Sequence, residues 1–103
     1  MHADELLNGA AHLVDSARRK NPLVYHITND VTGHLSADAV LALGGSPVMS
    51  SSPLESAEIT SRADALVVNT GTPGRQRVKA MFLAGRRAMQ EGIPAVLDPV
   101  GAG

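Results

Sequence analysis

The sequence contains no cysteine, and one Phe and one Tyr are its only large aromatic side chains in 103 residues. The lack of cysteine excludes a disulfide framework and a thiolate metal site. The formal net charge is −1, so the chain lacks the excess of positive charge that attracts nucleic acid or an anionic membrane. Its apolar runs are far shorter than the roughly 20 residues of a membrane span, and the acidic start is unlike a signal peptide. We expect a cytoplasmic protein that binds neither nucleic acid nor membrane.

With few aromatic residues, Leu, Val, Ile and Ala must fill the interior, which suits parallel strands covered by helices. Apolar periodicity predicts a first helix over 4–19 and a second from Asn29 or Asp30 to about 43. A third helix is expected to start at about 53, and a fourth to end at Gly92. Short apolar runs predict strands over 23–27, 46–49, 65–68 and 93–97. Alternating strands and helices indicate βαβ units, hence an α/β fold with a parallel sheet.

The sequence also predicts how the third helix starts and which side of the fourth helix faces the core. For the third, Ser52 is the expected N-cap, Pro53 the first helical residue and Glu55 the partner in a capping box. For the fourth, apolar spacing predicts a single core-facing side made of Val78, Met81, Phe82, Gly85, Ala88 and Met89.

The four predicted strands all end in small or polar residues, namely those at 26–30, 48–51, 69–72 and 98–103. Parallel sheets of this type bind ligands outside the carboxyl ends of their strands. We therefore expect a ligand site at this edge, although any α/β protein needs some polar capping residues there.

The last strand runs into Asp98 and the Gly-rich segment 99–103. Asp98 suits a Mg²⁺ contact, because that ion prefers oxygen ligands; equally, it could cap the backbone of its own Asp-Pro turn. Gly101 and Gly103 would let backbone amides approach a phosphate closely, or could form a plain turn. A glycine-rich turn after a strand normally leads into a helix, so we expect the chain to be the first part of a larger sheet.

Two residues near the other strand ends are candidates for ligand contacts. Asn29 can hydrogen-bond a ligand or simply cap the next helix, and Met49 can form an apolar wall or belong to the core. The four histidines do not have a zinc-binding spacing. No Ser/His/Asp or paired-carboxylate pattern can be argued, so we assign no catalytic residue within this chain.

Four segments together resemble the hydroxyethylthiazole kinase family. They are His26-Ile27-Thr28-Asn29-Asp30-Val31, Leu41 through Met49 (Leu-Ala-Leu-Gly-Gly-Ser-Pro-Val-Met), Asn69-Thr70-Gly71-Thr72, and Leu97 through Gly103 (Leu-Asp-Pro-Val-Gly-Ala-Gly). The order and spacing fit along nearly the whole chain.

The resemblance implies a ribokinase-like three-layer αβα fold, with residues 1–103 as the amino-terminal part of a single domain. It implies transfer of the γ-phosphate of ATP, with Mg²⁺, to the hydroxyl of 4-methyl-5-(2-hydroxyethyl)thiazole in thiamine salvage, by a homotrimer. Met49 and Asn29 would contact the thiazole, Asp98 would lie beside the metal, and Gly101 and Gly103 beside the phosphates. The ATP site and the group that activates the hydroxyl would lie beyond residue 103.

Two departures from the family pattern concern the pocket. Asp30 stands where the family usually has Asn, and Gly33-His34 stands where it has Thr-Asn. Two alternatives stay open: a short non-catalytic remnant that binds a small ligand or a kinase subunit, and a kinase for another small alcohol such as a hydroxymethylpyrimidine.

Overall fold

The computed structural model describes residues 3–28, 30–71 and 74–98. Its helices are α1 (Ala3–Lys20), α2 (Asp30–Ala42), α3 (Ser56–Arg62) and α4 (Arg75–Glu91), and its strands are β1 (Leu23–Ile27), β2 (Ser46–Met49), β3 (Ala65–Asn69) and β4 (Ala95–Asp98). The predicted alternation of helices and strands is confirmed.

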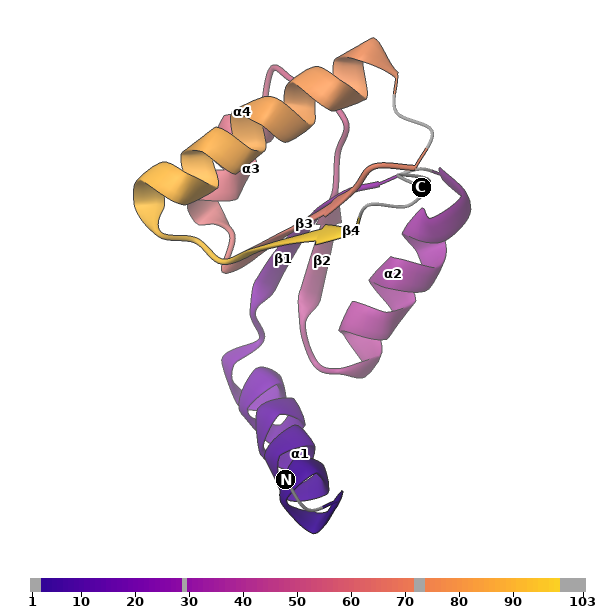
Figure 1. Cartoon of the computed structure of the whole chain (residues 1–103), viewed down its shortest axis with the longest axis vertical. Coiled ribbons are helices and arrows are strands. Elements are labelled where there is room, and N and C mark those ends of the chain that lie inside the picture. The colour runs from indigo at the N-terminus through magenta and orange to yellow at the C-terminus, as the bar shows by residue number, and fades with distance from the viewer. Residues whose placement is uncertain (1–2, 29, 72–73, 99–103) are drawn as a thin grey trace.

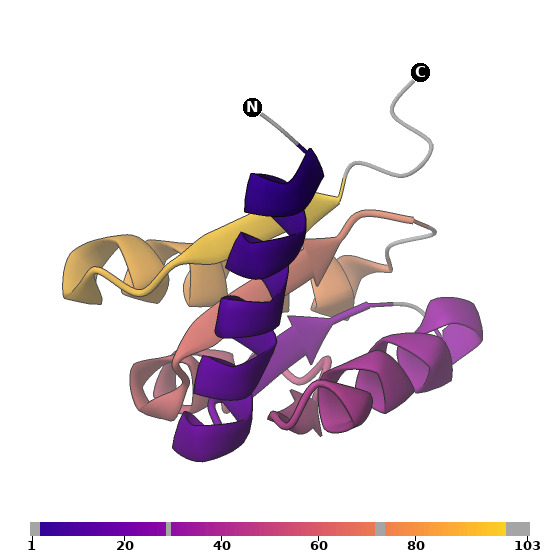
Figure 2. The same cartoon turned by 90° about the horizontal axis from the view of Figure 1, so that it is seen from below.

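All strand pairs in the sheet are parallel, in the order β2-β1-β3-β4. The chain moves one way across the sheet from β1 to β2 and the other way from β2 through β3 to β4. Because such crossovers are right-handed, α2 lies on one face of the sheet, and α3 and α4 lie on the other (Figures 1 and 2). Helices on both faces of a parallel sheet give three layers, which confirms the α/β fold.

The buried core lies between the sheet and α4. Tyr25 and Ile27 of β1, with Leu66 and Val68 of β3, face the alanines at 80, 84 and 88. These alanines recur every four residues along one side of α4. Their short side chains allow the helix to approach the strands and α3 closely.

The predicted core-facing side of α4 was therefore largely wrong. Of its six members, Ala88 is buried, whereas Val78, Phe82 and Met89 are exposed. Met81 is partly buried against the core, and the remaining fully buried positions of α4 are Ala80 and Ala84, which the prediction did not include.

The predicted start of α3 was also wrong. The helix begins at Ser56, with Glu55 in the N-cap position and no side-chain cap. The Oγ of Ser52 instead accepts a hydrogen bond from the amide of Leu54 (3.3 Å), and the hydroxyl of Ser50 donates to Glu55 Oε1 (2.6 Å). Because the Glu55 carboxylate bonds Ser50, the capping box does not form and the segment before Ser56 is a turn.

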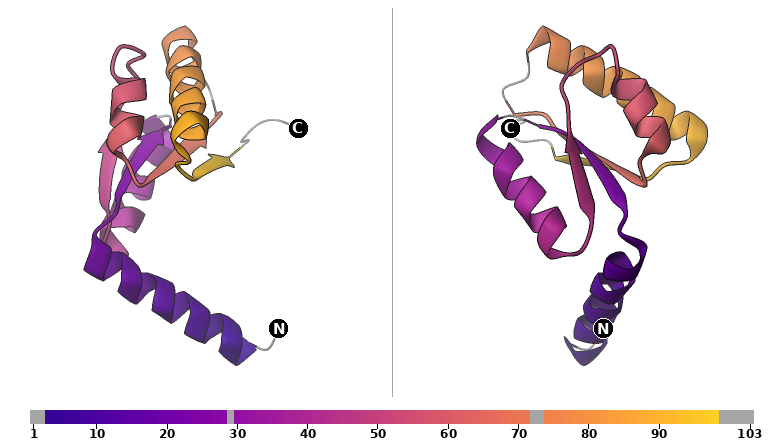
Figure 3. Two further views of the ribbon diagram at one scale, coloured as in Figure 1. Left: turned by 90° about the vertical axis from the view of Figure 1, so that its left-hand side faces the viewer. Right: turned by 180° about the vertical axis from the view of Figure 1, so that it is seen from behind.

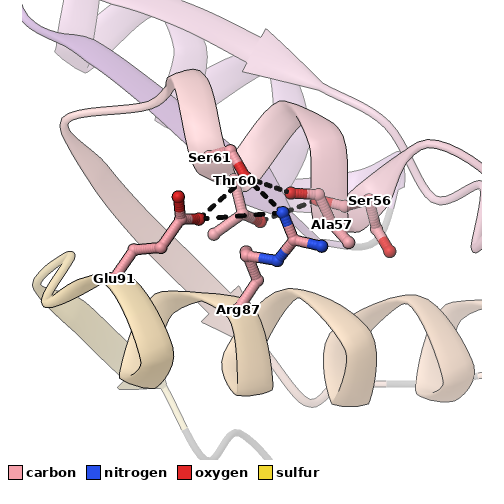
Figure 4. Close-up of polar contacts among 6 residues, drawn as sticks. All are labelled: Ser56, Ala57, Thr60, Ser61, Arg87 and Glu91. Atoms are coloured by element: carbon pink, nitrogen blue, oxygen red, sulfur yellow. Dashed lines mark hydrogen bonds and ion pairs between the residues drawn. The ribbon is translucent and has the colours of Figure 1, made fainter.

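Polar side chains join α3 to α4 (Figure 4). A guanidinium nitrogen of Arg87 donates to Ser61 Oγ at 2.8 Å, and that hydroxyl donates to Glu91 Oε2 at 2.8 Å. Within α3, the hydroxyl of the adjacent Thr60 donates to the carbonyl of Ser56 at 2.7 Å. The bonds of Ser61 to Arg87 and Glu91 hold the two helices side by side over the sheet.

Helix α1 projects away from the sheet (Figures 1 and 3) and has no buried residue. Its predicted apolar stripe, which includes Leu6, Leu7 and Leu13, is exposed. Its last turn approaches the α2–β2 connection, where Gly44 has a φ of +94° and a Cβ would stand 2.5 Å from Arg18 Cγ. Within the described ranges, no helix is both long and apolar enough to cross a membrane.

Candidate functional site

A pocket of about 400 Å³ opens at the carboxyl ends of β1 and β2. Its lining comes from three elements and their adjoining turns: His26 and Thr28, then Gly33, His34 and Ala37, then Met49, Ser50 and Ser51. The volume falls in the range of small-molecule sites, about 300–1,000 Å³. It also lies at the edge of the sheet where the sequence predicted a site.

The sheet register brings His26 and Met49 together. His26 of β1 pairs with Met49 of β2, so their side chains point to the same face. That face is the one covered by α2. The Met49 methyl reaches α2 at Gly33, where a Cβ would stand 3.2 Å from Met49 Cε. A side chain at position 33 would thus narrow the pocket.

His26 is the most buried side chain of the pocket, with 4% of its surface exposed. Neither ring nitrogen is accessible to solvent, and neither has a hydrogen-bond partner among the described residues. Burial lowers the pKa of His26 below its usual 6.5, because the charged imidazolium is poorly solvated there. The pocket therefore contains a neutral imidazole near physiological pH.

Tyr25 connects the pocket wall to the core on the opposite face of the sheet. Its ring is fully buried, and its hydroxyl donates to the carbonyl oxygen of Ser50 at 3.2 Å. Burial raises the pKa of Tyr25, a hydrogen bond with the Ser50 side chain lowers it, and the negative charge of the Glu55 carboxylate raises it. The neutral phenol thus fixes the position of Ser50 at the mouth of the pocket.

Of the predicted site residues, Met49 lies in the pocket and Asp98 does not. Asp98 is exposed at the carboxyl end of β4, at the same edge of the sheet but three strand spacings from β2, or about 14 Å. The predictions for Asn29, Gly101 and Gly103 fall outside the described residues. Within the described ranges, no group of three or more potential metal-ligating side chains occurs.

His26 belongs to the strand end at 26–30 where we expected a ligand site, but Asn29 was the residue chosen there as the ligand contact. A usable signal was present in the alternation of strand side chains. Tyr25 and Ile27 belong to one face, so His26 and Thr28 belong to the other. That this other face carries a pocket depends on the position of α2.

The fold is that of an α/β protein with a pocket of small-molecule size at the carboxyl edge of a parallel sheet. The model that describes the Hydroxyethylthiazole kinase family matches residues 14–103. The chain belongs to this family.

Named relatives agree with this assignment. The chain is 47% identical over 97 residues to the hydroxyethylthiazole kinase of Alkaliphilus metalliredigens. This match covers 94% of the chain and 36% of that protein. It is 51% identical over 86 residues to the hydroxyethylthiazole kinase of Clostridium tetani, covering 84% and 31%.

A solved structure of a hydroxyethylthiazole kinase protein from Pyrococcus horikoshii superposes with a TM-score of 0.83 at 42% identity. The match covers 87% of this chain and 35% of that one. The chain thus spans about a third of the length of the relatives that it matches.

Proposed function

We propose that this chain is the substrate-side part of an enzyme that transfers the γ-phosphate of ATP to the hydroxyl of the thiazole alcohol. The observation that supports this most is the pocket containing Met49, at the predicted edge of the sheet in a member of this family. Apolar walls beside a few polar groups suit a small heterocyclic alcohol. Within this pocket Met49 supplies an apolar wall, and we assign Asn29 to the same substrate.

We assign the phosphate end of the reaction to the other side of the same edge. Asp98 offers an exposed carboxylate at the end of β4, and one carboxylate together with phosphates and waters is a usual Mg²⁺ environment. Bound there, Mg²⁺ would neutralise phosphate charge, which is the main catalytic need in phosphoryl transfer. Gly101 and Gly103 are the proposed phosphate-binding residues.

The proposed enzyme would be cytoplasmic and homotrimeric, and the described residues would form the first part of its single ribokinase-like domain. These statements rest on the family resemblance and on composition.

The test begins with the protein as its source makes it, isolated at its natural length. Its intact mass is compared with the 10.7 kDa of this chain, and ADP release is then measured with the thiazole alcohol, with a hydroxymethylpyrimidine and with no alcohol. Turnover that requires the thiazole alcohol supports the proposal. Turnover with the pyrimidine alone would replace the substrate, and binding without turnover would favour the non-catalytic alternative.

A further inference from the structure

His26 has a hydrogen-bonding capacity that the rest of the described chain does not use. Its two ring nitrogens are buried and unpartnered. A neutral imidazole has one N–H donor and one acceptor nitrogen. Leaving both unsatisfied away from water costs free energy, so a native structure that retains such a group calls for an explanation.

The place of His26 in the pocket suggests that explanation. Met49 is its neighbour across the sheet. A Cβ at Gly33 would stand 3.2 Å from Met49 Cε and 3.6 Å from Thr28 Cγ2, and all three residues line the same pocket. Met49 is 40% exposed, and its unbranched side chain has several rotamers available. A turn of the Met49 side chain toward solvent would open a path from the pocket to the imidazole.

The orientation of a bound alcohol follows from what phosphoryl transfer requires. The hydroxyl must stay at the open end, where a phosphate donor can reach it, so the opposite end of the molecule enters the buried part of the pocket. In the thiazole alcohol, the ring nitrogen lies across the ring from the hydroxyethyl arm. That nitrogen is a hydrogen-bond acceptor, and the neutral imidazole provides a donor.

We propose that the His26 ring N–H donates a hydrogen bond to the ring nitrogen of a heterocyclic alcohol bound in this pocket. The alcohol reaches the imidazole when the Met49 side chain turns away from Gly33. His26 is then a specificity-determining residue that selects rings with an in-plane nitrogen. This inference rests on the proposed function and adds to it a substrate class and the residue that recognises it.

The experiment measures the dissociation constants of two ligands for the natural-length protein by calorimetry. One ligand is the thiazole alcohol, and the other is its thiophene analogue, in which C–H replaces the ring nitrogen. The variants are His26→Leu, which cannot donate a hydrogen bond, and His26→Asn, which can. His12→Leu is the matched control, because His12 is exposed and does not line the pocket, and α1, which carries it, projects away from the sheet (Figure 1).

We expect the wild-type protein and His12→Leu to bind the thiazole alcohol about tenfold more tightly than the thiophene analogue, as for one hydrogen bond in a buried site. His26→Leu should bind the two ligands within about twofold of each other, and His26→Asn should recover part of the preference. Such a double-mutant cycle isolates the His26–nitrogen contact from any effect on folding. The KM for ATP should not change.

Equal affinity of the wild-type protein for the two ligands would overturn the inference, and that comparison needs no variant to fold. A preference that survives in His26→Leu would also overturn it. Either result would leave the proposed phosphotransfer intact, whereas a wild-type protein that binds no thiazole alcohol would overturn the proposed function together with this inference.

Discussion

Replacing glycine by alanine at different positions of this fold should change stability with opposite signs. At Gly44 the backbone has a φ of +94°, and an added Cβ would stand 2.5 Å from Arg18 Cγ and 2.7 Å from Arg18 Cα. The left-handed conformation costs an alanine about 1–2 kcal/mol, and crowding against a neighbouring backbone adds about 1–3 kcal/mol. We expect Gly44→Ala to lower the free energy of unfolding by about 2–5 kcal/mol.

Two other glycines separate these contributions. Gly92 has a φ of +69° with nothing within 4 Å of a Cβ, so Gly92→Ala should cost only the conformational strain, about 1–2 kcal/mol. Gly85 lies inside α4, also with nothing within 4 Å. Alanine there should raise the free energy of unfolding by about 0.5–1 kcal/mol, since glycine loses more conformational freedom in a helix.

The assay is urea unfolding of the natural-length protein, with the slope of the transition compared among variants so that a shift in midpoint reports stability. The expected order of stability is Gly85→Ala, wild type, Gly92→Ala, Gly44→Ala. Equal losses at Gly44 and Gly92 would refute the steric part of the reasoning, because α1 would then move away from the new methyl group without cost. A loss at Gly85 would refute the conformational part.

Further predictions concern the pocket and the metal. Tyr25→Phe removes the hydrogen bond to Ser50 and should lower the unfolding free energy by about 1 kcal/mol in urea titrations; an unchanged midpoint would contradict this. Burial lowers the pKa of His26, so the unfolded chain binds the proton more readily, and the free energy of unfolding should fall as the pH drops through about 6.5, by at most about 1.4 kcal/mol per pH unit for one proton. Unfolding measured from about pH 8 to 5 should be less pH-dependent in His26→Leu. A profile identical to wild type would show that His26 does not cause the pH dependence. Met49→Ala should weaken binding of the thiazole alcohol about fivefold, equivalent to about 1 kcal/mol of apolar contact, with ATP binding as the control; unchanged thiazole affinity would remove Met49 from the pocket. Asp98→Asn should reduce Mg²⁺-dependent turnover at least about tenfold, while the melting temperature stays close to wild type because the side chain is exposed; wild-type turnover with a lower melting temperature would make Asp98 structural.

Local sequence patterns were enough to predict the parallel sheet. The strands at 23–27 and 46–49 match their predicted bounds, and α4 ends at Gly92 in the left-handed conformation. These features depend on neighbouring residues, namely apolar runs, alternation and a glycine that tolerates a positive φ. The edge of the sheet that carries the pocket was also predictable, because parallel strands place their carboxyl ends together.

Other features depended on contacts between distant segments. The start of α3 moved to Ser56 because Glu55 bonds Ser50 rather than capping the helix. The buried side of α4 carries Ala80, Ala84 and Ala88, whereas Phe82 is exposed, and this choice depends on where α3 and the sheet pack against the helix.

The sequence by itself determined the order of elements, the parallel sheet, the edge of the sheet at which the pocket lies, and Met49 as a pocket candidate. Only the tertiary structure decided that His26 lies beside Met49 under α2, with both ring nitrogens buried. Only the strand order separated Asp98 from that pocket. The physical reason is that periodicity specifies which residues share a face of one element, whereas the neighbours of that face depend on register, crossover direction and the room left between packed layers.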